Sequence, residues 1–393
     1  MKYEQYLNRR IAAVPPSGIR RFFDLASSRK DAISLGVGEP DFKTPYMIRD
    51  AAINSLVDGE TQYTANRGLP ELRQEIAVYL KGRYGISYDW NTQILVTIGA
   101  SEAIDIALRA LVENGDEVLV PDPSYVSYAP GVVFAGGTPV PVTTYQKDDF
   151  RLTAESLEKA ITPRSKLLIL PYPNNPTGAI MEKADLEAVA RVVEKHDLLV
   201  ISDEIYSELI YDGHTHVSFA SLEGMYPRTI TINGFSKAFA MTGWRVGYAC
   251  AAEEIIGVMN KIHQYAIMCA PRQGQVAALA ALRTGRENGY ESILAMRDSY
   301  DRRRRLMVSA FREMGLDCFD PFGAFYVFPS VSRTGLSSEE FCAQLLQEKD
   351  VAAVPGTAFG PSGEGHIRCC YATAIDKINI ALERMSDFVA HHS

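Results

Sequence analysis

The chain has 393 residues, of which 47% are hydrophobic and 22% are charged. This composition is typical of a folded protein and excludes a mainly disordered chain, and the length fits a large domain with a smaller one. The formal net charge of −8 gives no electrostatic basis for binding nucleic acid or an anionic membrane surface.

Three local features bear on location and chemistry. The one dense basic run, residues 302–305, lies in a helix-like stretch, and we interpret it as a solvated face. The N-terminus lacks the apolar stretch of a signal peptide, and no apolar run is long enough to span a membrane, so we expect a cytoplasmic protein. The cysteines show no C-x-x-C spacing, so we expect neither a metal nor a disulfide scaffold but free thiols. They are Cys250, Cys269, Cys318, Cys342, Cys369 and Cys370.

The N-terminal segment is irregular, because Pro15, Pro16 and Gly18 interrupt any early helix, and such an arm must lie on its own body or on a partner subunit. From residue 45 onward, helical stretches alternate with short apolar runs, a pattern typical of a covered, mostly parallel sheet. A helical stretch at residues 101–112 follows the first run. The runs are residues 94–98, 117–120, 166–170, 198–202, 229–232 and 246–250.

The pattern changes after residue 285. A long charged helix is predicted at residues 290–314, a strand at 322–328, a helix at 337–349, a short strand at 351–354 and then a terminal helix. We therefore predict an α/β protein whose large domain, residues 45–285, has a mostly parallel sheet covered by helices. A smaller α+β domain would combine the N-terminal arm, residues 1–44, with residues 286–393.

Candidate site residues follow several of the predicted strands, where ligands bind in open α/β sheets. Lys237 follows the run 229–232, Arg245 comes eight residues later, and Asp203 ends the run 198–202. A lone loop lysine is usually a surface lysine. Together, a lysine, a carboxylate and an arginine are what pyridoxal phosphate (PLP) needs for its aldehyde, its ring nitrogen and its phosphate.

Asp203 has a second interpretation, as the N-cap of a following helix. If that segment is helical, Tyr206 lies one turn away and could reach the 3-oxygen of the cofactor, although a lone Tyr is more often a core residue. Asn175, in the Pro-bounded turn 172–178, could donate to the same oxygen and to a substrate carboxylate, or could simply serve the turn.

Two further groups could bind anions. Gly99, Ala100 and Ser101 join a strand to a helix, where free N–H groups and the positive end of the helix dipole favour a phosphate, although Ser101 could be only an N-cap. Arg368 lies between apolar residues and needs an anion, which is either a substrate α-carboxylate or a structural ion-pair partner. Tyr125, after another strand, could stack on the pyridine ring.

In order and spacing, these residues resemble the fold-type I PLP-dependent aminotransferases of class I/II, in particular the bacterial and archaeal aspartate, aromatic and related aminotransferases. The likeness covers nearly the whole chain. It lies in residues 35–42, 63–73, 174–178 and 236–245 and in Arg368.

The resemblance implies a role for each residue. Lys237 would carry PLP covalently and move a proton, Asp203 would pair with the ring nitrogen, and burial would lower the pKa of the lysine from about 10.4. The other implied cofactor contacts are Gly99, Ala100, Ser101, Tyr125, Asn175, Tyr206, Ser236 and Arg245. Arg368, the Gly38 backbone and Asn175 would hold the substrate.

The family also works as a homodimer, which implies that Tyr63 reaches the phosphate of the neighbouring subunit. Ile19 and Tyr63 would line an apolar side-chain pocket, and Ser101 stands where aspartate-specific members have a lysine. The apolar lining and the missing lysine both favour aromatic or aliphatic amino donors. Arg272 could read a distal carboxylate across the dimer, but we prefer to interpret it as a surface charge.

We therefore expect a ping-pong transfer of the amino group from an L-amino acid to a 2-oxo acid such as 2-oxoglutarate. A β-lyase on the same scaffold and an aspartate- or diaminopimelate-type aminotransferase are the alternatives. A non-enzymatic regulator module fits less well, because the cofactor residues are intact and no DNA-binding domain is appended. A dinucleotide oxidoreductase is disfavoured because no G-x-G-x-x-G follows the first strand.

Overall fold

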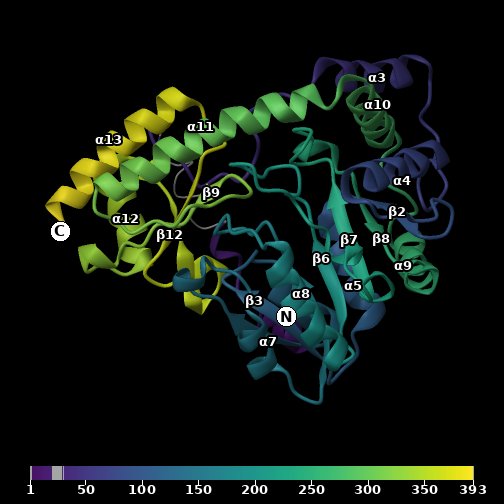
Figure 1. Ribbon diagram of the computed structural model, residues 1–393, viewed down its shortest axis with the longest axis horizontal. Coiled ribbons are helices and arrows are strands. Elements are labelled where there is room, and N and C mark those ends of the chain that lie inside the picture. Colours follow the sequence, from purple (N-terminus) through teal and green to yellow (C-terminus); the bar gives the residue numbers. More distant parts are fainter. Residues whose placement is uncertain (1, 20–28, 30, 393) are drawn as a thin grey trace.

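A computed structural model describes residues 2–19, 29 and 31–392. Its centre is a seven-stranded sheet in the order β2-β8-β7-β6-β5-β3-β4, in which β8 alone runs antiparallel to its neighbours (Figure 1). The strands are β2 (Ile94–Thr97), β3 (Glu117–Asp122), β4 (Thr138–Thr143), β5 (Ser165–Leu170), β6 (Leu199–Asp203), β7 (Thr229–Gly234) and β8 (Gly247–Cys250). The predicted mostly parallel α/β sheet is confirmed.

Both faces of this sheet are buried, because alternate residues of each strand pack into different helix layers. In β5, Leu167 and Ile169 join a cluster with α5, α6 and α9, whereas Leu168 and Leu170 join a cluster with α7 and α8. The helices are α5 (Gly99–Leu111), α6 (Tyr128–Ala135), α7 (Ala154–Ala160), α8 (Lys183–Lys195) and α9 (Glu253–Ala266).

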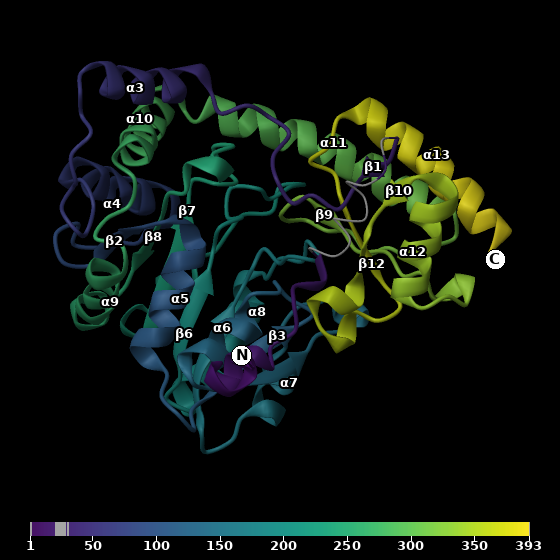
Figure 2. The same ribbon diagram turned by 180° about the vertical axis from the view of Figure 1, so that it is seen from behind.

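A third apolar cluster lies at the β2 edge of the sheet, where three helices pack together. They are α3 (Tyr46–Val57), α4 (Pro70–Tyr84) and α10 (Arg272–Asn288). The long helix α11 (Glu291–Glu313) runs from this group to the C-terminal helices in both views (Figures 1 and 2). It therefore connects the two ends of the molecule.

The C-terminal part has its own core, built around α11, α12 and α13 and including Leu35 from the N-terminal segment. Its elements are β1 (Ile33–Ser34), β9 (Tyr326–Val327), α12 (Ser338–Lys349), β10 (Val351–Ala352), β11 (Val354–Pro355), β12 (Ile367–Cys370) and α13 (Ile375–His391). β1 pairs with β10, and β11, β12 and β9 form an antiparallel sheet. The division at residues 45 and 286 stays a prediction.

The N-terminal arm lies on its own chain where it is described. α1 (Arg9–Ala12) packs against α6 (Figure 2). Arg10 donates a hydrogen bond of 3.1 Å to the side chain of Asn114. Gly18 lies against Ala358 in the loop after β11. Residues 20–28 and 30 lie outside the described residues.

Several local predictions were wrong. Of residues 322–328 only β9 is a strand, because the backbone turns at Ala324, whose φ is +58°. The single strand predicted at 351–354 is two, β10 and β11, in different sheets. The edge strand β4 was missed.

The basic run is a solvated face only in part: Arg302 and Arg305 are exposed, but Arg303 and Arg304 are not. The Arg304 side chain is only 2% exposed and pairs with Asp301 and Asp212. Arg303 pairs with Asp41 at 2.8 Å and is also largely buried, because the inner face of α11 packs on the C-terminal core. The remaining irregular and 3-10 elements are η1 (Tyr3–Tyr6), η2 (Gln146–Asp148), η3 (Phe219–Ser221), η4 (Tyr226–Arg228), η5 (Thr242–Trp244), η6 (Ser332–Thr334), η7 (Gly356–Phe359) and η8 (Pro361–Gly363).

Candidate active site

Lys237 lies three residues after the end of β7, at the carboxyl edge of the sheet. Its ammonium group donates a hydrogen bond of 2.7 Å to the carbonyl of Gly38, and it lies 5.7 and 5.4 Å from the ring centres of Tyr206 and Phe325. Burial lowers the pKa of Lys237 to about 8, because desolvation disfavours the charged amine, and Arg368 and Arg245 lower it further. Ser236, just before it, is buried. The amine is therefore easier to deprotonate than an ordinary lysine.

Asp203 ends β6, the neighbour of β7 in the sheet, and its side chain is buried. One carboxylate oxygen accepts a hydrogen bond of 2.7 Å from the phenol of Tyr128, and the other accepts one of 3.2 Å from the N–H of Ile205. Burial raises the pKa of Asp203 to about 6, against the opposing effect of these bonds. The chain turns after Asp203 without forming a helix, so the N-cap interpretation is wrong.

Gly99, Ala100 and Arg245 are brought together at the start of α5. Gly99 has a φ of +70°, and a Cβ placed on it would lie 2.5 Å from Nη2 of Arg245. A Cβ on Gly247 would lie 2.5 Å from the backbone nitrogen of Ala100. The close packing leaves the free N–H groups of the helix start beside a guanidinium group, which suits a phosphate. Ser101 is exposed at the same helix start.

Arg368 is 2% exposed and has no acidic partner among the described residues, so the alternative of a structural ion pair is not supported. Its guanidinium donates to Asn175 Oδ1 at 2.8 Å and to the carbonyl of Gly36 at 2.5 Å, while Nε is buried without a partner in the described part of the chain. It lies between the rings of Tyr326 and Phe359, at 4.5 and 4.7 Å. A buried arginine with an unpaired N–H is suited to bind a carboxylate.

The loop formed by η7 and η8 carries Phe359 against Arg368. Three glycines shape it: a Cβ on Gly356 would collide with the carbonyl of Gly363, and one on Gly360 (φ +133°) with the carboxylate of Asp122. Ser362 donates to Asp122 at 2.8 Å. Because Gly18 lies against Ala358, Ile19 of the arm is placed beside this loop.

The aromatic candidates differ in their surroundings. The phenols of Tyr206 and Tyr326 lie 2.8 Å apart, and a Cβ on Gly38 would lie 2.5 Å from the Tyr326 oxygen. Tyr206 lies on a turn, not on the helix that the spacing suggested. The ring of Tyr125 is 5.5 Å from that of Tyr128. Tyr63 is 77% exposed.

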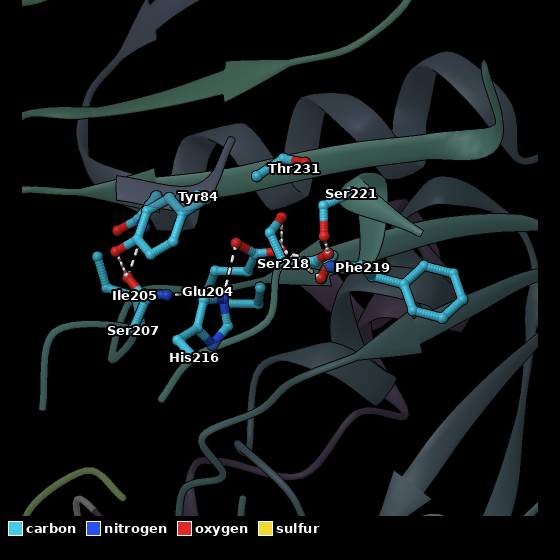
Figure 3. A network of polar contacts seen from close by, with 12 residues as sticks. Tyr84, Glu204, Ile205, Ser207, His216, Ser218, Phe219, Ser221 and Thr231 are labelled. Atoms are coloured by element: carbon cyan, nitrogen blue, oxygen red, sulfur yellow. Dashed lines mark hydrogen bonds and ion pairs between the residues drawn. The ribbon is translucent and has the colours of Figure 1, made fainter. Parts of the chain in front are cut away.

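A buried polar network supports the turn that carries Asp203 and Tyr206 (Figure 3). The Glu204 carboxylate accepts hydrogen bonds from the hydroxyls of Ser202 and Ser218, at 3.0 and 2.7 Å, and lies 2.9 Å from Nε2 of His216. Tyr84 packs its ring edge-on to that of His216, 5.3 Å away. Glu204 therefore fixes the backbone on which both candidate residues lie.

Sequence reasoning missed four contributors: Tyr128, Tyr326, Phe359 and Glu204. Tyr128 stands three residues after the candidate Tyr125, and this closeness in the sequence was the available signal, although Tyr125 itself precedes α6. Glu204 adjoins Asp203 in the sequence, and two consecutive acidic residues after an apolar strand could have indicated a buried network.

The chemical groups present fit PLP. Lys237 offers an amine of lowered pKa for the aldehyde, Asp203 a buried carboxylate for the ring nitrogen, and Arg245 with the start of α5 a place for the phosphate. Within the described residues, no group of three or more His, Cys, Asp or Glu side chains could hold a metal ion, and no helix is long and apolar enough to cross a membrane.

Comparisons with known proteins agree with this geometry. Residues 30–385 match the family model for aminotransferases of class I and II. The chain is 50% identical over 384 residues to the putative aminotransferase YugH of Bacillus subtilis, with 98% of both chains covered. It is 49% identical over 376 residues to an aspartate aminotransferase of Pyrococcus abyssi, with 96% of each covered. A solved aromatic aminotransferase of Pyrococcus horikoshii superposes with a TM-score of 0.90 at 48% identity, covering 94% of this chain and 99% of that one.

Proposed function

Because the chain belongs to the class I and II aminotransferases, a PLP-dependent family, we propose that it moves the amino group of an aromatic or aliphatic L-amino acid to a 2-oxo acid such as 2-oxoglutarate. The transfer would follow a ping-pong order. The observation that carries the proposal is the partly buried amine of Lys237, which has a lowered pKa and lies at the same sheet edge as Asp203.

Each residue of the site has a proposed task. When bound, PLP supplies an electron-withdrawing ring that allows an amino group and a proton to be exchanged at the substrate Cα. Asp203 would keep the ring nitrogen protonated, and Nζ of Lys237, once free, would take the proton from the substrate Cα. Tyr206 and Asn175 would bind the 3-oxygen, and Tyr125 would stack on the ring.

The substrate would be held by its α-carboxylate on Arg368, whose unpaired Nε supports this role. Arg272 is half-buried and lies 3.0 Å from the Glu60 carboxylate. It is therefore neither a simple surface charge nor a free cation for a distal carboxylate, the two interpretations that the sequence allowed. Because Glu60 already neutralises it, Arg272 is a poor receptor for a second carboxylate, and this favours an apolar substrate side chain.

A second substrate class has a specific observation in its favour. The Pyrococcus abyssi relative, 49% identical, bears the name aspartate aminotransferase. A dicarboxylic donor would require a cation at the distal end of the pocket, and Ser101 supplies none. We therefore rank this class second.

We also propose a cytoplasmic homodimer. Large exposed apolar side chains gather on α3, at Tyr63 and at the end of α9, and hydrogen bonds from Asn66 to Met268 and from Arg272 to Glu60 hold these segments together. Exposed apolar side chains that cluster in this way are typical of protein–protein interfaces. Its members are Tyr46, Met47, Ile53, Leu56, Val57, Tyr63, Tyr265, Ile267 and Met268.

The test is an absorbance spectrum of the purified protein with PLP, before and after adding Phe, Tyr, Leu, Ala, Asp or Glu. We expect a near-visible band that an accepted amino acid removes and a 2-oxo acid restores, and that Lys237→Ala lacks. Arg368→Lys should keep the cofactor band and raise KM about a hundredfold, because it loses the bidentate contact.

Two results would contradict the proposal. A protein that takes up no PLP would remove the role of Lys237. Release of pyruvate and ammonia from a sulfur amino acid, without any 2-oxo acid acceptor, would indicate a β-lyase instead.

A further inference from the structure

Glu102 and His263 form a pair next to the turn at which α5 begins, with side chains that are 14% and 0% exposed. His263, on α9, is fully buried, and its Nδ1 lies 2.7 Å from one carboxylate oxygen of Glu102. The other oxygen accepts a hydrogen bond of 2.5 Å from the backbone N–H of Ile98. A side chain of α9 is thereby linked, through one carboxylate, to the residue that precedes Gly99.

The turn needs such support because its backbone is irregular. β2 ends at Thr97, Ile98 has φ −75° and ψ 75°, and Gly99 has φ +70°. Thr97 holds the other side of the turn, since its hydroxyl donates to the carbonyl of Gly99 at 2.9 Å. With Gly99 tight against Arg245, a small shift of the turn would change how the N–H groups of Ala100 and Ser101 face that guanidinium.

His263 is an unusual choice for its position. The neighbouring residues of α9, Ile256, Met259 and Ile262, pack into an apolar cluster with α5. Nε2 of His263 is buried and has no hydrogen-bond partner within the described residues. An apolar side chain would avoid that unpaired atom, so the contact with Glu102 is the interaction that justifies a histidine here.

We propose that Glu102 and His263 are positioning residues for the cofactor phosphate. Neither would touch the phosphate. They order the turn at Ile98. The N–H groups of Ala100 and Ser101 and the guanidinium of Arg245 would then all point toward the same phosphate group. This rests on the proposed function, in particular on phosphate binding at the start of α5.

The test compares PLP with pyridoxal, which has the same ring and aldehyde but no phosphate. Dissociation constants for both are measured by absorbance titration of the cofactor-free protein. In Glu102→Ala and His263→Leu the affinity for PLP should fall about ten- to a hundredfold, the range for a lost hydrogen bond to a charged group, while that for pyridoxal changes little.

Two variants serve as controls. His263→Asn, whose amide can take the place of Nδ1, should keep most of the PLP affinity. Asp105→Asn, on the same helix, removes only an exposed pair with Arg109 at 3.4 Å and should change neither constant. If Glu102→Ala does not fold, as judged by circular dichroism, the two His263 variants carry the comparison.

The outcomes separate the inference from the proposed function. Equal losses for PLP and pyridoxal would mean that the pair supports the fold generally, and would overturn the positioning role. A loss in His263→Asn as large as in His263→Leu would also overturn it. A wild-type protein that binds neither compound would overturn the proposed function itself, and this inference with it.

Discussion

Tyr128 donates a hydrogen bond of 2.7 Å to the carboxylate of Asp203, so the first residue of α6 is linked to the last residue of β6. The phenol is one of two groups that donate to this buried carboxylate in the described structure. The contact therefore favours the ionised form of Asp203.

Tyr128→Phe should impair turnover while leaving the cofactor bound. Without the phenol, the pKa of Asp203 should rise further above about 6, because that hydrogen bond favours the ionised form. We expect kcat/KM to fall about tenfold at pH 7, the scale of one hydrogen bond to a charged group. Steady-state kinetics, with rates divided by the amount of bound PLP, measure this change. Tyr226→Phe is the control, because that phenol donates to the Ser87 carbonyl and to Gln93 instead. Equal kinetics for both variants would contradict the prediction.

Asp203→Asn should stabilise the cofactor-free protein and abolish its activity. In the unfolded chain this carboxyl has a pKa of about 3.9, whereas folding raises it to about 6. Between these values the unfolded state releases the proton first, so the free energy of unfolding falls as the pH rises, by up to about 3 kcal/mol in all.

The gain in Asp203→Asn should accordingly be present at pH 7 and small near pH 4. Thermal unfolding of both proteins without cofactor at the two pH values tests this. If the variant is no more stable than the wild type at pH 7, ionisation of the buried Asp203 carboxylate does not lower the free energy of unfolding.

Lys237 should react with a small amine-specific reagent at lower pH than an ordinary lysine. Burial lowers its pKa to about 8, so the neutral amine becomes the main form above that pH. Mass spectrometry of the cofactor-free protein should show labelling that rises through pH 8. The same residue in urea-unfolded protein is the control and should follow a pKa of about 10.4. Identical profiles would contradict the lowered pKa.

Arg304 and Arg305 give a matched test of burial. Both pair with Asp301 and Asp212, but their side chains are 2% and 60% exposed. Arg304→Ala should cost about 3 kcal/mol of unfolding free energy, because it removes a buried side chain that pairs with two partly exposed carboxylates. Arg305→Ala should cost less than about 1 kcal/mol. Urea unfolding compares the two, and similar costs would show that exposure does not decide the contribution.

The same pair of arginines shows where sequence reasoning stops. Four consecutive arginines are indistinguishable locally, and only packing of α11 on the C-terminal core decides which are buried. By contrast, β5 and β6 were predictable, because strands buried on both faces contain nearly continuous apolar runs, here residues 167–170 and 199–201. β4 was not, because Pro139 and Pro141 disfavour a strand and are tolerated at a sheet edge, where β4 pairs only with β3.

For the site, the residues at the ends of strands or shortly after them could be proposed from the sequence, since topology gathers them at one edge. Lys237, Asp203 and Asn175 are of this kind. Tyr326 and Phe359 contact Arg368 from β9 and from the loop after β11. The position of Tyr326 follows from the pairing of β9 with β12, a contact between distant parts of the chain for which a single sequence carries no local signal.

The glycines of the loop after β11 restrict how substrate choice could be redesigned. Gly356, Gly360 and Gly363 each stand where a side chain would collide with a carbonyl or a carboxylate. Libraries that randomise this loop should therefore lose folded members at those three positions. Variation would have to be confined to Thr357, Ala358 and Phe359, which leaves the path of the backbone unchanged while altering what it presents beside Arg368.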